Sequence, residues 1–253
     1  MLKKRLIAVL IVRDGQVVQS VRFKHTNAIH YNSIHAIECF NRWAVDEIII
    51  LNVARSPESR DDFSEIIYHI SKLCFVPLSV GGWITDDEYA EKLLRSGADK
   101  LVFNTAFSVN HQLVKRLSNR FGQQCIVGSM DVKLRHDGKT TVWVDRGRID
   151  TGVAPLIWAH NMIKNGSGEI LFNSIDHDGA RGGYNLSILS TLVKHLPVPV
   201  IAFGGVFSWD HLVEGLSVGA QAVAAANIFH YTEHSTRKAK QYLINANIAM
   251  RRE

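Results

Sequence analysis

The stretch that decides the fold spans residues 77–107 and reads PLSVGGWITDDEYAEKLLRSGADKLVFNTAF. Its apolar beginning predicts a buried strand, and the diglycine Gly81-Gly82 predicts a tight turn after that strand. Asp86 is a predicted helix N-cap, and apolar residues then recur at helical spacing until Gly97. A second apolar run, 101–103, predicts another strand. A strand, a helix and a strand in this order require a parallel crossover.

A similar stretch, residues 199–229, returns in the second half of the chain as PVIAFGGVFSWDHLVEGLSVGAQAVAAANIF. Its diglycine and its Gly-Ala pair lie about half a chain after those of the first stretch. The repeat predicts one domain, 1–253, that consists of two similar halves, approximately residues 1–122 and 123–253. A diglycine after a strand lets backbone N–H groups approach an anion closely. Two matched copies favour two phosphate sites, with tight turns alone as the alternative.

Apolar and amphipathic stretches alternate along the whole chain. We expect strands at 5–12, 47–52, 77–80, 101–103, 125–131, 169–173, 199–203 and 222–225. Outside the two repeated stretches, we expect helices at 33–43, 60–73, 110–121, 154–164, 186–195 and 233–246. Eight alternating units predict an α/β fold, a (β/α)8 TIM barrel. The polar residues 19–31 predict a mobile lid loop, and the turn at 136–138 predicts a hairpin.

The composition excludes several classes of protein. No apolar run approaches the ~20 residues of a transmembrane helix, so we expect no membrane contact. Three cysteines without a CxxC pair are typical of a reduced, cytoplasmic protein. The net charge is +5, but the basic residues are scattered, so we expect no nucleic-acid partner. The 12 histidines show no convincing ligand spacing, and we expect no metal and no cofactor.

In a barrel of this kind, the carboxyl ends of the strands and the loops after them carry the function. Most candidates there have small or amide side chains, which are suited to holding anions. The set is Ile11, Asn52, Gly81, Gly82, Asn104, Thr105, Asp131, Asp178, Gly179, Gly204, Gly205, Ala226 and Asn227.

The whole chain resembles the HisF-like family, the cyclase subunits of imidazole glycerol phosphate synthase. The motifs that carry this resemblance include MLKKRLI, VDEIIILN, VPLSVGGWI, SGADKLVFNTA, GSGEILFNSIDHDG and PVIAFGG. The resemblance implies that each half of the barrel binds one phosphate of a bisphosphate substrate. The first phosphate site would consist of Gly82, Asn104 and Thr105, and the second of Asp178, Gly179, Gly205, Ala226 and Asn227.

The catalytic positions of the family are only partly kept. The resemblance implies two catalytic aspartates, of which Asp131 matches one, whereas Ile11 stands at the other position. Isoleucine cannot transfer a proton, and general acid–base help is typically worth ~10²–10⁴-fold, so we expect cyclase activity to be absent or very weak. Further departures replace a lid lysine, an aspartate, a glycine and a small polar residue by Gln19, Asn52, Trp83 and Phe203.

A set of charged residues at the opposite end of the barrel is kept. The resemblance implies that Arg5, Glu47, Lys100 and Glu169 form a gate for ammonia, on the amino-terminal face where a glutaminase subunit docks. Each of the four starts or precedes a strand, so their side chains can meet at the barrel floor. The alternative is a ring of salt bridges that only closes the barrel.

These observations favour a divergent HisF-like paralogue that takes ammonia from a glutaminase partner and passes it through the barrel to another acceptor. Relatives of this kind resemble those of surface-polysaccharide (lipopolysaccharide) biosynthesis, where a third, ATP-using amidotransferase helps to build an acetamidino sugar. One alternative is the cyclase of histidine biosynthesis, with a water or a lid histidine such as His25 or His30 as the acid. A second alternative is a non-catalytic scaffold that activates a glutaminase.

Overall fold

The computed structural model describes residues 3–31, 45–230 and 235–251. Eight parallel strands form a closed barrel. Each strand pairs with the next one along it, and β12 pairs with β1 to complete the circle. The strands are β1 (Arg5–Arg13), β4 (Glu47–Asn52), β5 (Leu78–Gly81), β6 (Lys100–Phe103), β7 (Ile126–Leu134), β10 (Glu169–Ser174), β11 (Val200–Phe203) and β12 (Ala222–Ala225). The predicted (β/α)8 barrel is confirmed.

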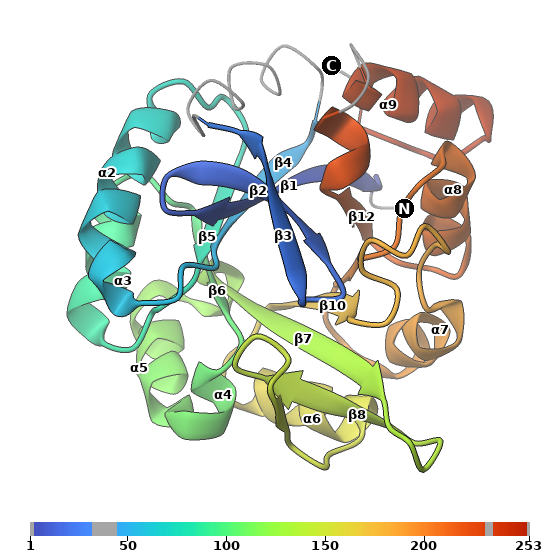
Figure 1. Ribbon diagram of the computed structural model, residues 1–253. Coiled ribbons are helices and arrows are strands. Elements are labelled where there is room, and N and C mark those ends of the chain that lie inside the picture. Colours follow the sequence, from blue (N-terminus) through green and yellow to red (C-terminus); the bar gives the residue numbers. More distant parts are fainter. Residues whose placement is uncertain (1–2, 32–44, 231–234, 252–253) are drawn as a thin grey trace.

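Helices surround the barrel on its outer side (Figure 1). They are α2 (Arg60–Ser71), α3 (Asp87–Arg95), the short α4 (Ala106–Val109), α5 (His111–Phe121), α6 (Pro155–Lys164), α7 (Leu186–His195), α8 (Trp209–Ser217) and α9 (Ser235–Asn245). Short 3-10 turns are η1 (Pro57–Ser59), η2 (Gln123–Cys125) and η3 (Asn227–His230). The helix expected at 33–43 lies outside the described residues. None of the described helices combines the length and the apolar character that crossing a membrane requires.

Local signals in the sequence explain where the helices begin and end. The Asp86 carboxylate accepts a hydrogen bond from the Tyr89 backbone N–H at 2.8 Å, so it caps α3 as predicted. After this helix the chain turns at Gly97, whose φ is 105°. A side chain at Gly97 would also collide with Ser71 at the end of α2. The glycine is therefore required both by the backbone and by the contact between neighbouring helices.

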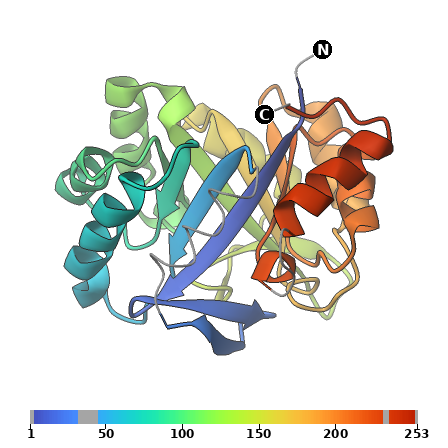
Figure 2. The same ribbon diagram turned by 90° about the horizontal axis from the view of Figure 1, so that it is seen from above.

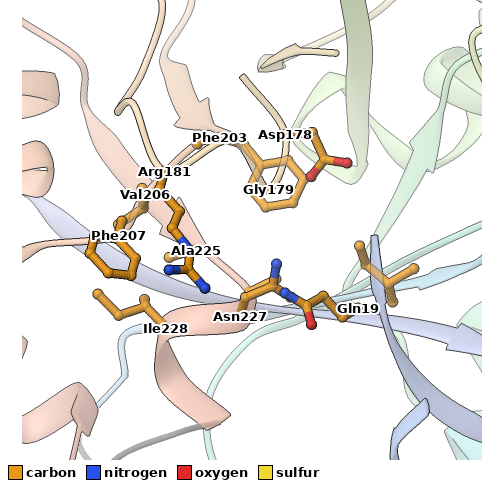
Figure 3. Close-up of a pocket in the computed structure, with 14 residues that line it drawn as sticks. Gln19, Asp178, Gly179, Arg181, Phe203, Val206, Phe207, Ala225, Asn227 and Ile228 are labelled. Atoms are coloured by element: carbon orange, nitrogen blue, oxygen red, sulfur yellow. The ribbon is translucent and has the colours of Figure 1, made fainter. Parts of the chain in front are cut away.

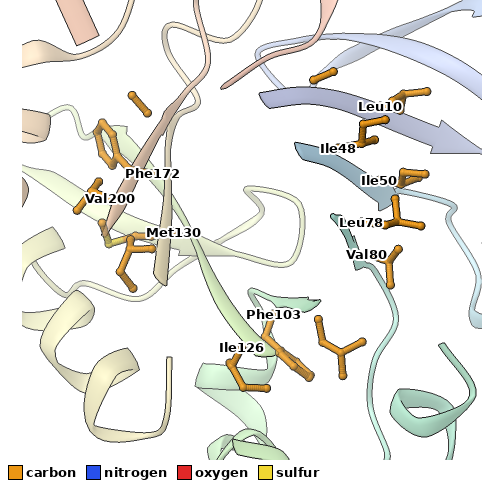
Figure 4. Packing of buried hydrophobic residues seen from close by; sticks show 14 of the residues in the cluster. Leu10, Ile48, Ile50, Leu78, Val80, Phe103, Ile126, Met130, Phe172 and Val200 are labelled. Carbon is orange, nitrogen blue, oxygen red and sulfur yellow. The ribbon is translucent and has the colours of Figure 1, made fainter. Parts of the chain in front are cut away.

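Two apolar layers hold the barrel together. Side chains alternate along each strand, so Leu6 and Ala8 of β1 pack under the helices while Ile7 and Val9 fill the barrel interior. The outer layer is the larger of the two. Figure 4 shows part of it, with Leu10, Ile48 and Ile50 among its side chains. The inner layer consists of Ile7, Val9, Ile49, Val102, Val127, Leu171, Ile201, Phe203, Ala222 and Ala224. Strands that are buried on both faces read as near-continuous apolar runs, which is why the sequence showed them clearly.

Two hairpins project from the carboxyl ends of barrel strands. β7 continues into the antiparallel β8 (Thr140–Val144) and the short β9 (Ile149–Asp150), which confirms the predicted hairpin. The lid loop expected over 19–31 is wrong, because β2 (Gln16–Val21) and β3 (His25–His30) form an antiparallel hairpin there. Val17, Val18 and Ser20 of β2 are buried, with a register shift between the two valines, so the strand lacks the simple alternation by which a sequence reveals a half-buried strand. This β2–β3 hairpin crosses the middle of the barrel in Figure 1, and Figure 2 places it at the opposite end from the start of β1.

Candidate functional site

Four charged side chains meet at the floor of the barrel. The Arg5 guanidinium donates to Glu47 Oε1 at 2.7 Å and also to Glu169. Lys100 Nζ lies 3.1 Å from Glu169 Oε2 and 3.4 Å from Glu47 Oε2. The two cations and two anions thus alternate around a closed ring. Burial lowers the pKa of Arg5, but the two carboxylates outweigh this effect and raise the pKa overall, so Arg5 stays charged.

The positions of these residues in the strands explain why the ring forms. Arg5, Glu47, Lys100 and Glu169 are each the first residue of their strand. The amino ends of parallel strands lie at the same end of a barrel, so four such residues face one another there. The contact between the four side chains could therefore be predicted from the sequence. The role of this ring as an ammonia gate stays a proposal.

Asp131 lies at the other end of the barrel, which we call the mouth. It is paired in register with Asn173 of β10, and its side chain is buried, with 8% of its surface exposed. Asn173 Nδ2 and Asn104 Nδ2 each donate a hydrogen bond of 3.0 Å to a different carboxylate oxygen. Burial raises the pKa of Asp131 to about 7, although the hydrogen bond from Asn173 opposes the rise. Near neutral pH, Asp131 can therefore both give and take a proton.

The position at which the family has its other aspartate faces the same space. Ile11 is in register with Leu51 and has 7% of its surface exposed. Its side chain contributes hydrocarbon to the mouth, where an aspartate would contribute a second titratable group. The site thus contains half of an acid–base pair.

Two cavities open at the mouth, and each collects one of the predicted sets of residues. The larger has a volume of about 590 Å³, and Gly82, Asn104, Thr105 and Asp131 are among its lining residues. The smaller, of about 230 Å³, is lined by the second set, Asp178, Gly179, Gly205, Ala226 and Asn227 (Figure 3). The structure therefore brings each set together in a cavity of its own, while phosphate binding there stays a prediction.

Comparison with known proteins gives the same family from the whole sequence. A family model described as "Histidine biosynthesis protein" matches residues 5–235. The chain is also 38% identical to "Imidazole glycerol phosphate synthase subunit HisF" of Caulobacter vibrioides (strain NA1000 / CB15N), over 99% of this chain and 97% of that protein. The chain belongs to the HisF-like family. The resemblance in the motifs is thereby confirmed.

The two diglycine turns of this HisF-like chain are both tightly packed. A Cβ atom at Gly82, where φ is 111°, would lie 2.2 Å from the Asn52 carbonyl oxygen. A Cβ atom at Gly205, where φ is 92°, would lie 2.1 Å from the Gly183 carbonyl oxygen. Packing alone therefore requires both glycines, so the assignment of phosphate sites depends on the cavities around them.

The larger cavity of the HisF-like barrel has a strong excess of positive charge, which the sequence analysis missed. Seven basic residues and only two acidic ones, Asp131 and Asp145, are among its lining residues. The basic residues are Arg13, Arg22, Lys24, Arg55, Lys133, Arg146 and Arg148. They are scattered along the sequence and only the barrel gathers them, although most follow strand ends, which is the one signal that could have found them.

Trp83, one of the departures from the family, also lines the larger cavity. It adopts a left-handed backbone conformation with φ of 56°, where a glycine is usual. Its indole Nε1 donates to the Ala54 carbonyl oxygen at 2.9 Å, and the Arg146 guanidinium lies 5.6 Å from its ring centre. These contacts hold a large aromatic ring at the cavity wall despite the backbone strain.

The β2–β3 hairpin is anchored on Asp178. Ser20 Oγ donates to Asp178 Oδ2 at 2.7 Å, and the Arg22 backbone N–H donates to the Asp178 carbonyl oxygen at 3.0 Å. Burial raises the pKa of Asp178, and the hydrogen bonds that it accepts oppose the rise. Farther along the hairpin, His30 Nε2 lies 3.1 Å from His230 Nδ1, so this lid histidine contacts η3. The carboxylate expected to line a phosphate site therefore also positions the hairpin.

Proposed function

We propose that this HisF-like chain is the ammonia-receiving subunit of a glutamine-dependent amidotransferase and that it does not cyclise a bisphosphate substrate. The contrast between the two ends of the barrel carries the proposal. The charged ring of the floor is intact, whereas Ile11 removes half of the acid–base pair at the mouth. In this proposal, the chain keeps the residues that receive ammonia and lacks one of the two that cyclisation requires.

The barrel interior suits neutral ammonia better than ammonium. Its inner layer is largely apolar from Ile7 and Val9 up to Phe203, with hydroxyl groups from the buried Ser79 and Ser129. Burying an unpaired charge there is costly. Ammonium would therefore have to leave its proton at the floor. At the mouth, Asp131 has a pKa of about 7 and can accept one proton from an attacking amine. Addition of ammonia to an activated acceptor needs one such base, whereas cyclisation by the family's route needs an acid and a base together.

The partners follow from this assignment. In the proposal, a glutaminase subunit docks on the amino-terminal face and supplies ammonia to the ring of Arg5, Glu47, Lys100 and Glu169. The excess positive charge of the larger cavity favours a phosphate or a phosphorylated acceptor. A third, ATP-using amidotransferase would activate the acceptor in the cytoplasm, during the synthesis of an acetamidino sugar for surface polysaccharide. Resemblance to such HisF-like relatives supports this last step.

Imidazole glycerol phosphate synthase activity, in histidine biosynthesis, is the second candidate function. Two observations favour it, the name of the Caulobacter relative and the pKa of Asp131 near 7. In this case Asp131 would serve as base in one step and as acid in the next.

A cyclase assay with high ammonia and the family's bisphosphate substrate tests the proposal without any partner. We expect no turnover by the unaltered chain. Ile11→Asp/Phe203→Ser restores the carboxylate and the small residue of the family, and we expect it to exceed its matched control, Ile11→Asn/Phe203→Ser, by ~10²-fold or more. The control keeps the size of the side chain but cannot transfer a proton. Robust turnover by the unaltered chain would overturn the proposal in favour of the second candidate.

A further inference from the structure

Very few side chains line both cavities of the mouth. Among the described residues, only Ile11 and Phe203 line both cavities. Both side chains are buried, with 7% and 6% of their surfaces exposed. The boundary between the cavities is thus made of hydrocarbon and contains neither a charge nor a hydrogen-bonding group from these two residues.

The strand arrangement places the two residues on either side of one strand. Ile11 lies near the end of the inward row of β1 and Phe203 ends β11, and both strands pair with β12 between them. Inward side chains from alternate strands form one layer in a barrel of this kind. β12 contributes only small residues nearby, Ala224 in the inner layer and Ala226 beside it. The large side chains of the neighbouring strands therefore form the boundary.

The β2–β3 hairpin completes the separation above this boundary. Ser20 lines the larger cavity and Asp178 lines the smaller, so the hydrogen bond of 2.7 Å between them crosses from one to the other. The Phe23 backbone N–H adds a contact of 3.4 Å to the same carboxylate oxygen. A ligand that extended between the cavities would have to displace both the hydrocarbon boundary and this anchor.

We infer that Ile11 and Phe203 are specificity-determining residues that divide the mouth into two separate anion sites, so that a single ligand with two phosphate groups cannot occupy both. The acceptor of this chain then carries its anionic group in the larger, basic cavity alone. The inference rests on the proposed function only for the anionic nature of the ligand. It deepens that function, because it excludes bisphosphates that bridge the mouth and selects ligands with one anionic end.

The test compares linear alkanediol bisphosphates of six to twelve carbons with alkyl monophosphates of equal length, by titration calorimetry. For the unaltered chain we expect each bisphosphate to bind no more than about twofold tighter than the monophosphate of equal length, because only one of its ends is held at a time. In Ile11→Ala/Phe203→Ser we expect a gain of about tenfold or more at one length, because the second phosphate then binds from the same molecule. The matched control Ile11→Val/Phe203→Leu keeps an apolar boundary and should behave as the unaltered chain.

Each outcome decides the inference. It is overturned if the unaltered chain already prefers a bisphosphate by tenfold, if no phosphate probe binds to it, or if the opened variant stays folded by circular dichroism and gains nothing. If that variant does not fold, the stoichiometry of the unaltered chain decides, since separate sites take two bisphosphates and a bridged mouth takes one. Cyclase activity of the unaltered chain with the family's bisphosphate substrate would contradict both the proposed function and the division, because that substrate bridges the mouth. A tenfold preference for a bisphosphate without cyclase activity would overturn the division and leave the proposed function intact.

Discussion

The floor and the mouth of the barrel differ in how their charges are balanced. At the floor, two cations and two anions alternate in a ring, and each contacts both neighbours of opposite sign. At the mouth, the larger cavity has seven basic residues against two acidic ones, and Asp131 faces amides instead of cations. Charge that is fully paired inside a protein serves its own structure, whereas an uncompensated excess in a cavity favours a ligand of opposite sign.

The comparison also shows which end has departed from its family. The resemblance in the motifs implies that the floor ring keeps the family's gate residues, and all four members form ion pairs within the ring. At the mouth, Ile11, Asn52, Trp83 and Phe203 all line the cavities and all depart from the family. The departures implied by the resemblance therefore line the cavities of the mouth and not the floor, as we expect if the proposed acceptor, and not the source of ammonia, differs from that of the family.

The largest expected effect comes from breaking the floor ring. Arg5→Met leaves the carboxylates of Glu47 and Glu169 buried with Lys100 as their remaining partner. Removing one member of a buried ion pair typically costs about 3–5 kcal/mol, and we expect this loss in the free energy of unfolding measured with urea. The matched control is Arg95→Met, which removes a pair with Glu91 on a side chain that is 82% exposed and should cost at most about 1 kcal/mol. Equal losses in both variants would show that the ring does not stabilise the floor.

The next effect concerns the stability of the mouth at different pH. Between pH 4 and 7 the folded chain keeps a proton on Asp131 that the unfolded chain releases, because folding raises this pKa from 3.8 to about 7. The contribution of this group to stability is therefore complete below pH 4 and declines as the pH rises to 7, by about 4 kcal/mol at most. Urea unfolding at a series of pH values should show this decline in the unaltered chain and a smaller one in Asp131→Asn, where the raised pKa of Asp178 still contributes. The exposed Asp14→Asn serves as control and should keep the decline.

A smaller effect tests the anchor of the hairpin. Ser20→Ala removes the hydroxyl donor from the buried Asp178 carboxylate, and a hydrogen bond to a charged group is worth about 1.5–3 kcal/mol. We expect amides of β2 and β3 to exchange hydrogen faster, while amides of the barrel strands keep their protection. Thr85→Ala removes an exposed hydroxyl 3.1 Å from Asp86 and is the control. Uniformly faster exchange across the barrel would show that Ser20 stabilises the whole fold and not the hairpin.

The smallest effect concerns the excess charge of the larger cavity. Arg146→Gln removes one of seven cations, and at several ångströms in a solvated cavity such a charge changes the affinity for inorganic phosphate by roughly two- to threefold. Titration calorimetry at low ionic strength measures the change. Lys92→Gln, on the outer surface of α3, should leave the affinity unchanged. A similar loss in both variants would assign the attraction to the net charge of the whole protein.

The barrel and its floor could be predicted from the sequence because their signals are local. Apolar strands, the Asp86 cap and the glycine turns each depend on a few neighbouring residues. The ring could be predicted as well, since a charged residue at the start of a parallel strand has only one end of the barrel to occupy. The strand ends also gave the position of Asp131, although Asn173 beside it was missed because an amide at a strand end is common.

The mouth could be predicted only in part because closure of the sheet creates it. The basic residues of the larger cavity are spread between Arg13 and Arg148 in the sequence, so no window of the chain contains their excess charge. The boundary of Ile11 and Phe203 depends on the closure of the barrel, which places the first and the seventh strand on either side of the last one. The β2–β3 hairpin was missed for a different reason, since its polar face resembles a loop when the buried face is short.

The way in which the β2–β3 hairpin is attached to the barrel bears on how fast the mouth can open. The hairpin joins β1 through two registered pairs, Val12 with Val17 and Arg13 with Gln16, and it contacts the rest of the barrel at Asp178 and His230. Swinging it aside breaks few bonds and leaves the eight barrel strands undisturbed. Collective loop motions of this kind take microseconds to milliseconds, so under the proposed function we expect the opening of the hairpin to set the rate at which an acceptor enters or leaves. Ammonia released while the hairpin is closed would then meet only the acceptor that is already inside.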